Sequence, residues 1–135
     1  MILKTYARMF STDCNATLVA LERLHGRQAH LRFRFGEWDL AGIGDMFVVA
    51  GTEESLAPIR DSHGPVIVHD LQAIEAELLA SGATITQPIV NVPTGRMLYA
   101  RHADGLHIEY VEWNDELVER FIRRPQREGR LSSEL

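Results

Sequence analysis

Two spacings of hydrophobic residues follow one another at the start of the chain. Apolar, β-compatible residues dominate Ile2–Thr12, and leucines then recur at every third position, as they do along one side of a helix. Asp13 or Asn15 can cap that helix, because a short side-chain oxygen accepts unpaired backbone N–H groups of the first turn. Gly26 stands where a left-handed helix end would fall. The pattern predicts a strand followed by a helix near Asn15–His25.

The same order returns in the second half of the chain. The β-branched run Val66–Val68 leads into a second cap, Asp70, and apolar residues then recur every three or four positions until Gly82. This cap and this glycine lie 57 and 56 positions after their counterparts in the first unit. The spacing predicts a second helix near Leu71–Ser81 and an internal repeat.

Three short hydrophobic segments follow each predicted helix, and glycines and prolines separate them, which favours antiparallel strands over a parallel sheet. The predicted fold class is therefore α+β. Two βαβββ modules, about residues 1–52 and 60–113, form a cup-shaped mixed sheet with the helices outside, in one domain spanning 1–113. Residues 114–135 are predicted to form a short helix, interrupted by Pro125, and a mobile polar tail.

Length and charge exclude several classes of protein. The 135 residues suffice for one globular domain, and a net charge of -5 argues against a general electrostatic grip on nucleic acid. No apolar run approaches the roughly 18 residues of a membrane span, and the first residues do not form a signal peptide. The single cysteine, Cys14, excludes an internal disulfide. We expect a cytoplasmic protein without nucleic-acid or membrane partners, and 13 arginines beside one lysine suggest a bacterial source.

Two segments of the second half carry a family resemblance. In HGPVIVHDLQAIEAELLASGA a histidine precedes a strand and an aspartate starts a helix, and in PTGRMLYARHADGLHIEYVEW a hairpin ends in Ile-Glu-Tyr. With the doubled βαβββ order, residues 1–113 resemble the vicinal oxygen chelate superfamily, which includes glyoxalase I, bleomycin-resistance proteins and extradiol dioxygenases. The resemblance implies a cup between the modules that binds a small molecule, and assembly as a homodimer.

The resemblance also implies where a divalent metal would bind. Metal-using members hold the ion on four strand positions, two per module, and these positions fall on His63 and Glu109 in the second module and on Tyr6 and Val48 in the first. Tyr6 and Val48 are not the usual ligands, and His63 with Glu109 is an incomplete set, because catalytic metal sites usually have three protein ligands. His107 shares a strand face with Glu109 and offers an alternative third ligand.

Basic and aromatic residues suggest the chemistry of the ligand. In the strand that contains Arg32 and Arg34, basic residues alternate with apolar ones, so one face is basic, and if that face lines the cup it favours a carboxylate or phosphate. Arg96 is a third candidate donor, and Tyr6 is placed inside the cup by the resemblance. Aromatic walls are expected from five residues: Tyr6, Trp38, Phe47, Tyr99 and Tyr110.

Two classes of function remain open. The first is a metal-free protein of the bleomycin-resistance kind that binds a small organic anion in its cup, with Tyr6, Arg32, Arg34, Val48, Arg96 and His107 as candidate ligand-binding residues. The second is a metal-dependent lyase, isomerase or dioxygenase of the glyoxalase kind that uses His63 and Glu109. A metal-free enzyme with His63 and Glu109 as an acid–base pair is a third possibility.

Overall fold

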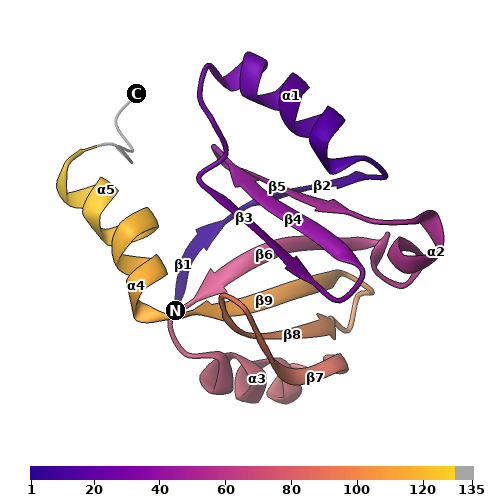
Figure 1. The fold of residues 1–135 in the computed structure, drawn as a ribbon. Coiled ribbons are helices and arrows are strands. Elements are labelled where there is room, and N and C mark those ends of the chain that lie inside the picture. The colour runs from indigo at the N-terminus through magenta and orange to yellow at the C-terminus, as the bar shows by residue number, and fades with distance from the viewer. Residues whose placement is uncertain (130–135) are drawn as a thin grey trace.

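A computed structural model describes residues 1–129 and shows two βαβββ modules (Figure 1). The first module comprises strands β1 (Ile2–Thr5) and β2 (Ala7–Ser11), helix α1 (Cys14–His25), and strands β3 (Leu31–Phe35), β4 (Trp38–Ile43) and β5 (Met46–Ala50). The short helices α2 (Glu53–Leu56) and η1 (Ala57–Ile59) lead to the second, with β6 (Ser62–Val68), α3 (Leu71–Ala80), β7 (Thr84–Val92), β8 (Gly95–Arg101) and β9 (His107–Trp113). The α+β class and the module order predicted from the sequence are confirmed.

Within residues 1–129 the strands form two mixed sheets that face each other. The order is β1-β6-β9-β8-β7 in the five-stranded sheet and β2-β5-β4-β3 in the four-stranded sheet. In each module the strand directly before the helix pairs in parallel with the last strand, β2 with β5 and β6 with β9, and the other pairings are antiparallel. Strand β1 joins the sheet of the second module, so the first ten residues tie the two modules together.

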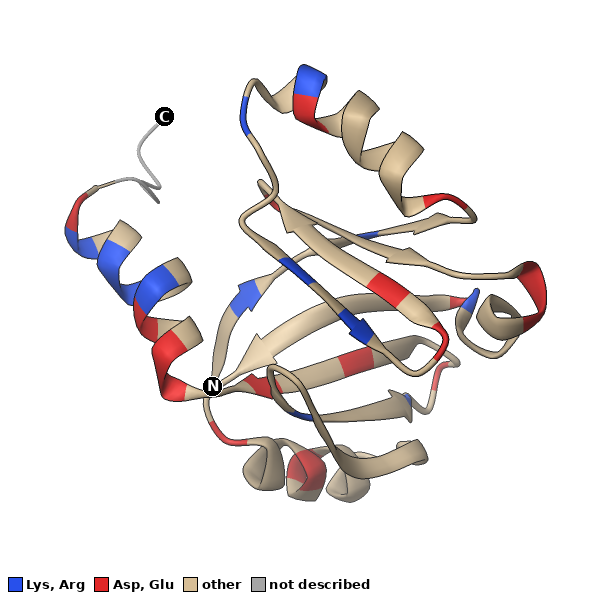
Figure 2. Cartoon of the chain, in the orientation of Figure 1, with Lys and Arg blue, Asp and Glu red and all other residues tan. Residues whose placement is uncertain are grey.

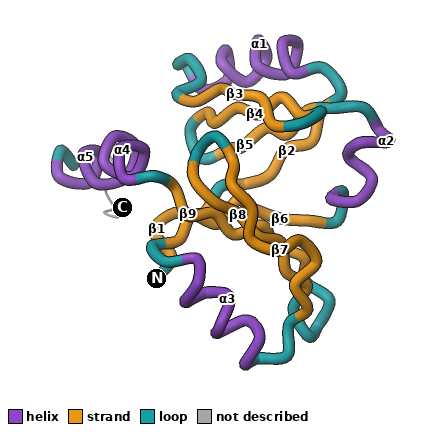
Figure 3. Tube along the Cα trace, turned by 60° about the horizontal axis from the view of Figure 1, so that its bottom comes forward, coloured by secondary structure: helices purple, strands orange, loops and turns teal. Residues whose placement is uncertain are grey.

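The two long helices begin and end close to the predicted residues. Asp13 accepts a hydrogen bond from the Ala16 backbone N–H, and Asp70 accepts from Gln72 and Ala73, so both helices have the predicted caps. Helix α1 ends at Gly26, whose φ of 68° is a left-handed conformation that glycine adopts without steric cost. Figure 3 shows α1 over the outer face of the four-stranded sheet and α3 over the outer face of the five-stranded sheet.

The core has three parts. Two smaller clusters lie under the helices: one under α1 contains Leu18 and Val48, and one under α3 contains Leu71 and Leu98. The largest cluster lies between the two sheets and draws residues from both modules, among them Tyr6, Phe47, Tyr99 and Trp113. The space between the sheets is therefore an apolar core that both modules share, and it contains a cavity.

A C-terminal helix packs against this central core. It consists of α4 (Asp115–Val118), a wide turn η2 (Glu119–Arg123) and α5 (Arg124–Arg127). The regular helix gives way to the wide turn just before Pro125, and Pro125 falls in the first turn of α5, where a backbone N–H is dispensable. Charges of both signs lie along this helix (Figure 2). The predicted mobile tail beyond residue 129 lies outside the described residues.

Two further observations bear on the sequence predictions. No helix within residues 1–129 is long and apolar enough to cross a membrane. Cys14, the only cysteine of the chain, is free and buried at the start of α1.

The C-terminal helix should contribute to global stability. Ile122 is 2% exposed in the central cluster, so Ile122→Ala should lower the free energy of unfolding by about 2–4 kcal/mol, through lost burial and the cavity left behind. Gln126→Ala, at an exposed position of the same helix, should change it by less than about 0.5 kcal/mol. Urea denaturation followed by circular dichroism measures both. Equal effects of the two variants would show that the helix is not part of the folding unit.

Candidate functional site

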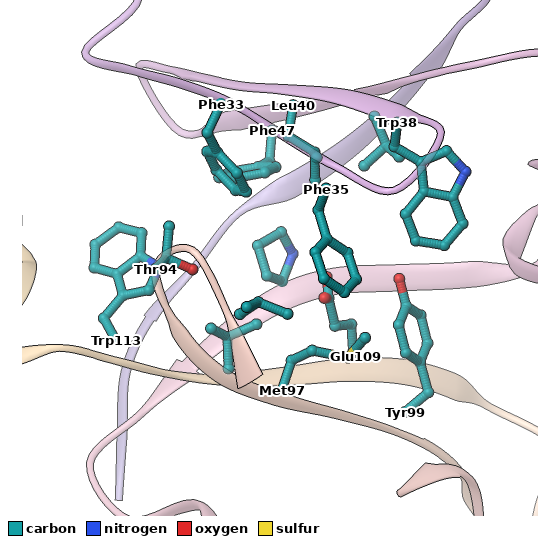
Figure 4. Close-up of a pocket in the computed structure, with 14 residues that line it drawn as sticks. Phe33, Phe35, Trp38, Leu40, Phe47, Thr94, Met97, Tyr99, Glu109 and Trp113 are labelled. Atoms are coloured by element: carbon teal, nitrogen blue, oxygen red, sulfur yellow. The ribbon is translucent and has the colours of Figure 1, made fainter. Parts of the chain in front are cut away.

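The hollow part of the central core is a cup between the two sheets. The unfilled space between its side chains is about 460 Å³ when the open solvent at its mouth is included, so the enclosed part is much smaller. Strands β3, β4 and β5 supply one wall, and the other comes from the five-stranded sheet, with residues of β6, β7, β8 and β9. Figure 4 shows the two walls. The lining residues are Phe33, Phe35, Trp38, Leu40, Phe47, Val49, Pro65, Val92, Thr94, Met97, Tyr99, Glu109, Val111 and Trp113.

Aromatic and aliphatic side chains make up most of this lining. Of the five aromatic residues predicted for the walls, Trp38, Phe47 and Tyr99 line the cup, whereas Tyr6 and Tyr110 do not. Polar groups within the lining come from Thr94, Tyr99 and Glu109. The two tryptophans add their indole N–H groups, and that of Trp38 donates to the backbone oxygen of Ser55 at 3.2 Å. Binding pockets for small organic molecules have this composition, an apolar surface with few polar anchors.

Beneath the cup lies a buried arginine. Arg8 of β2 points away from α1, and its guanidinium is bound by groups from three strands of the other module. Its Nη2 donates to Glu109 Oε1, and its Nη1 donates to Tyr99 Oη at 3.1 Å and to Ser62 Oγ at 2.8 Å. The Arg8 side chain is 2% exposed and that of Glu109 13% exposed, so solvent screens this ion pair weakly.

The contacts within this cluster shift the pKa values of Arg8 and Tyr99. Burial alone would lower the pKa of Arg8, but the negative charge of Glu109 and the hydrogen bonds to Tyr99 and Glu109 outweigh it and raise that pKa. Burial, and then the nearby carboxylate of Glu109, raises the pKa of Tyr99 well above its usual value. At neutral pH the cluster therefore contains a charged guanidinium and a protonated phenol.

Backbone geometry brings Glu109 close to β6. Gly64 has a φ of 119°, and a Cβ atom at this position would lie 2.8 Å from the backbone oxygen of Glu109. A side chain at Gly64 would therefore push β6 away from β9. This close approach sets Ser62 and Pro65 beside Glu109, on the inner side of the sheet.

The structure places the two residues predicted to act together, His63 and Glu109, differently. Glu109 lines the cup as expected, but His63 is exposed and has no contact with it. The buried neighbour Ser62 takes the inward position, because the pairing of β6 with β9 is irregular between His63 and Val66. A shift of one residue on a strand moves a side chain to the opposite face.

Val48 shows the same one-residue difference in the first module. It is fully buried under α1, on the outer face of the four-stranded sheet, and its neighbours Phe47 and Val49 face the cup instead. The expectation that Val48 contacts a ligand is therefore corrected.

Tyr6 is buried next to the cup but does not line it. Its hydroxyl forms a 2.9 Å hydrogen bond with His30 Nε2, and its ring packs against Phe47 and Trp113. Burial raises the pKa of Tyr6 far above its usual value, so its phenol stays protonated. Tyr6 acts as a core residue, and Arg8, two residues further along β2, makes the contact with Glu109.

The arginines predicted to attract an anion lie outside the cup. Arg32 and Arg34 are exposed, since the cup-facing residues of β3 are Phe33 and Phe35. Arg32 binds Asn15 Oδ1 at 2.7 Å, and Arg34 lies 3.7 Å from Asp39.

Arg96 is paired with Glu112 at 3.1 Å and likewise does not line the cup. The alternation in β3 was identified correctly, but the apolar face is the one that lines the cup. The predicted preference for an anion thus loses its three donors.

His107 lies behind the cup wall and both its ring nitrogens are engaged. Nδ1 lies 2.8 Å from Asp61 Oδ1 and Nε2 lies 2.8 Å from Thr86 Oγ1. The hydrogen bond from His107, followed by that from Arg101, lowers the pKa of Asp61, so this carboxylate accepts and Nδ1 carries the proton. Neither nitrogen remains free for a metal or a ligand.

These residues do not fit a divalent metal. No three His, Cys, Asp or Glu side chains converge within residues 1–129. Of the four positions that the resemblance implied, only Glu109 faces the cup, and its carboxylate is already paired with the positive charge of Arg8. A metal cation there would meet electrostatic repulsion from the guanidinium.

Arg8 was not among the site residues predicted from the sequence. The sequence offered one signal for it: Arg8 is a charged residue between apolar neighbours. It also lies two positions after Tyr6 and therefore on the same strand face. Its partners come from β6, β8 and β9, far away in the sequence, so the signal could not show what Arg8 binds.

Comparison with known proteins supports the resemblance. No protein-family model matches the chain, and no curated protein sequence matches it. An uncharacterized protein from Methanosarcina mazei is similar in structure with a TM-score of 0.78 and 34% identity, over 84% of this chain and 94% of that one.

Two methylmalonyl-CoA epimerases share the fold. The enzyme of Mycobacterium tuberculosis has a TM-score of 0.70 and 14% identity, over 87% of this chain and 93% of its own. A variant of the Streptomyces coelicolor enzyme in complex with 2-nitronate-propionyl-CoA has a TM-score of 0.67 and 14% identity, over 85% and 97%. The chain therefore has the fold that its resemblance to the vicinal oxygen chelate superfamily implied.

The buried ion pair should show strong coupling in stability measurements. Arg8→Met leaves the Glu109 carboxylate without its partner and should cost about 3–5 kcal/mol of unfolding free energy, because an uncompensated charge stays in a poorly solvated site. The double variant Arg8→Met/Glu109→Leu should recover most of this loss. Denaturant titrations of the wild type, both single variants and the double variant give the coupling. Additive losses would show that the two charges act independently.

His30 should make stability depend on pH. Burial, followed by the charges of Lys4 and Arg27, lowers the pKa of His30 to about 4, against only a small opposing effect of Asp45. Between about pH 6.5 and pH 4 the unfolded chain therefore binds a proton more readily than the folded protein does. The free energy of unfolding should fall by about 1–2 kcal/mol as the pH falls through this range, a modest amount because the ring is partly exposed.

A comparison of two histidine variants measures this effect. Unfolding free energies at pH 7 and pH 4.5 should differ less in His30→Gln than in the wild type. His69→Gln, at an exposed position, should keep the wild-type difference. The same pH dependence in all three proteins would assign the effect to other groups.

Proposed function

We propose that the protein binds a small, flat organic molecule in its cup and does so without a divalent metal. The observation that carries the proposal is the pairing of the Arg8 guanidinium with Glu109, directly beneath an aromatic cup. The guanidinium supplies the positive charge that Glu109 requires in this buried position. A binding protein of the kind represented by bleomycin-resistance members fits these features.

The arrangement of the two walls of the cup supports a flat ligand. Phe35 and Trp38 project from β3 and β4 toward the opposite sheet, where Met97 and Tyr99 lie (Figure 4). The two sheets thus present opposed walls with a narrow space between them. Aromatic side chains gain additional energy from stacking on planar rings, beyond the burial of apolar area.

The charge balance supports a neutral ligand instead of the anion predicted from the sequence. Arg8 and Glu109 cancel each other, and the arginines at positions 32, 34 and 96 lie outside the cup. An anion would also lie beside the carboxylate of Glu109. The metal-dependent and acid–base alternatives with His63 are not supported, because His63 is exposed. The homodimer remains a prediction.

Ligand binding through the aromatic wall should depend on Phe35. Naphthalene-sized neutral arenes should raise the melting temperature, and Phe35→Ala should weaken their binding roughly tenfold through lost stacking and burial. Arg34→Ala, the adjacent residue on the opposite strand face, should leave binding unchanged. Thermal-shift titrations with matched arenes, carboxylates and amines provide the measurement.

Two outcomes would contradict the proposal. Carboxylates that stabilise the protein more than neutral arenes would restore the anion hypothesis. A near-stoichiometric transition metal, found by elemental analysis of protein purified without a histidine tag, would overturn the metal-free cup.

A further inference from the structure

The floor of the cup offers one hydrogen-bond donor and one acceptor side by side. Resting on the proposed function, we infer that the ligand is a neutral planar ring whose edge carries an N–H next to a C=O, as in a lactam. In this arrangement Glu109 accepts from the N–H of the ligand, and Tyr99 donates its hydroxyl hydrogen to the C=O.

The donor is the hydroxyl of Tyr99. Arg8 Nη1 donates to the oxygen of this hydroxyl at 3.1 Å, so the oxygen already acts as an acceptor. Its hydrogen has no acceptor among residues 1–129. A phenol that stays protonated and is 4% exposed needs a partner for this hydrogen, and Tyr99 lines the cup.

The acceptor is the second carboxylate oxygen of Glu109. Oε1 accepts from Arg8, whereas Oε2 has no hydrogen-bond partner within the described part of the chain. The carboxylate of Glu109 points into the cup beside the hydroxyl of Tyr99 (Figure 4). An ionised carboxylate only accepts hydrogen bonds, so Glu109 favours a ligand that carries a donor.

The spacing of the two groups is set by the structure. Tyr99 and Glu109 are directly opposite partners on the antiparallel strands β8 and β9, and their side chains therefore emerge next to each other. One guanidinium binds both, through neighbouring nitrogens of one planar group. The Tyr99 hydroxyl and the Glu109 carboxylate are thus spaced to match two neighbouring nitrogens of the planar Arg8 guanidinium. The same spacing suits two neighbouring polar atoms of a planar ligand in the cup.

Other ligand classes satisfy this pair less well. A carboxylate offers no donor and places a second negative charge beside Glu109. A plain arene gains the aromatic walls but leaves the hydroxyl hydrogen of Tyr99 and Oε2 of Glu109 without partners. A lactam fused to an aromatic ring satisfies both hydrogen bonds and keeps its flat apolar part against the wall that Phe35 and Trp38 form.

Three bicyclic probes test this inference by calorimetry or thermal shift. These are 2-quinolinone, its N-methyl derivative, which lacks the donor, and naphthalene, which lacks both polar atoms. The wild type should bind 2-quinolinone roughly tenfold or more tightly than either of the other two, because the N–H pairs with a charged acceptor. Equal affinity for 2-quinolinone and naphthalene would overturn the lactam inference and leave the proposed cup function intact; the absence of binding by all three would overturn both.

Variants then assign the two hydrogen bonds. Tyr99→Phe should weaken 2-quinolinone roughly tenfold and leave naphthalene unchanged, and Tyr110→Phe is the matched control. Tyr110 is the residue next to Glu109 on β9, faces α3 and bonds to His102 at 2.7 Å, so its loss should not affect either ligand.

Glu109→Gln separates hydrogen bonding from the bulk of the added methyl group. The glutamine can give its oxygen to Arg8 and turn its NH₂ toward the cup, which removes the acceptor. The preference for 2-quinolinone over its N-methyl derivative should then fall to less than about threefold. A preference that persists in this variant, or a Tyr99→Phe variant that behaves like Tyr110→Phe, would overturn the inference.

Discussion

A buried ion pair links the two halves of this protein across the core that they share. Arg8 comes from the first module, and its partners Ser62, Tyr99 and Glu109 come from the second. Neither module could bury its own part of this cluster alone, because an unpaired charge in such a site costs several kcal/mol. The pair also determines the chemistry of the cup, because the positive charge of Arg8 balances the negative charge of Glu109, the carboxylate that lines the cavity. The Arg8 Nε atom is buried without a hydrogen-bond partner in the described residues, and this costs free energy that the other contacts of Arg8 must offset.

The sequence was sufficient to predict those features that depend on local chemistry. Asp13 and Asp70 cap helices because their side chains accept from the next backbone N–H groups, and this requires only neighbouring residues. The repeat could be read for the same reason, because both modules carry the same cap and the same terminal glycine at nearly equal spacing. The fold class followed from the repeat, since each module needs the other to cover its sheet.

The strand faces could not be predicted as well, because they depend on pairing between distant segments. The irregular pairing of β6 with β9 turns Ser62 inward and His63 outward, and no local signal marks it. In β3 the alternation of basic and apolar residues is unambiguous, yet it does not say which face meets the other module. Arg8 illustrates the same limit, because its role depends on Glu109, about a hundred residues further along the chain.

The cup and the C-terminal helix belong to one packing unit. Trp113 lines the cup and its ring lies 6.2 Å from that of Phe121, which in turn lies 5.0 Å from the ring of His30. His30 bonds to Tyr6, and Tyr6 packs on Phe47 at the opposite wall of the cup. A ring of contacts thus runs from one sheet through the helix to the other sheet. The helix therefore closes one end of the space between the sheets, and the packing that positions the aromatic walls extends beyond the two repeated modules.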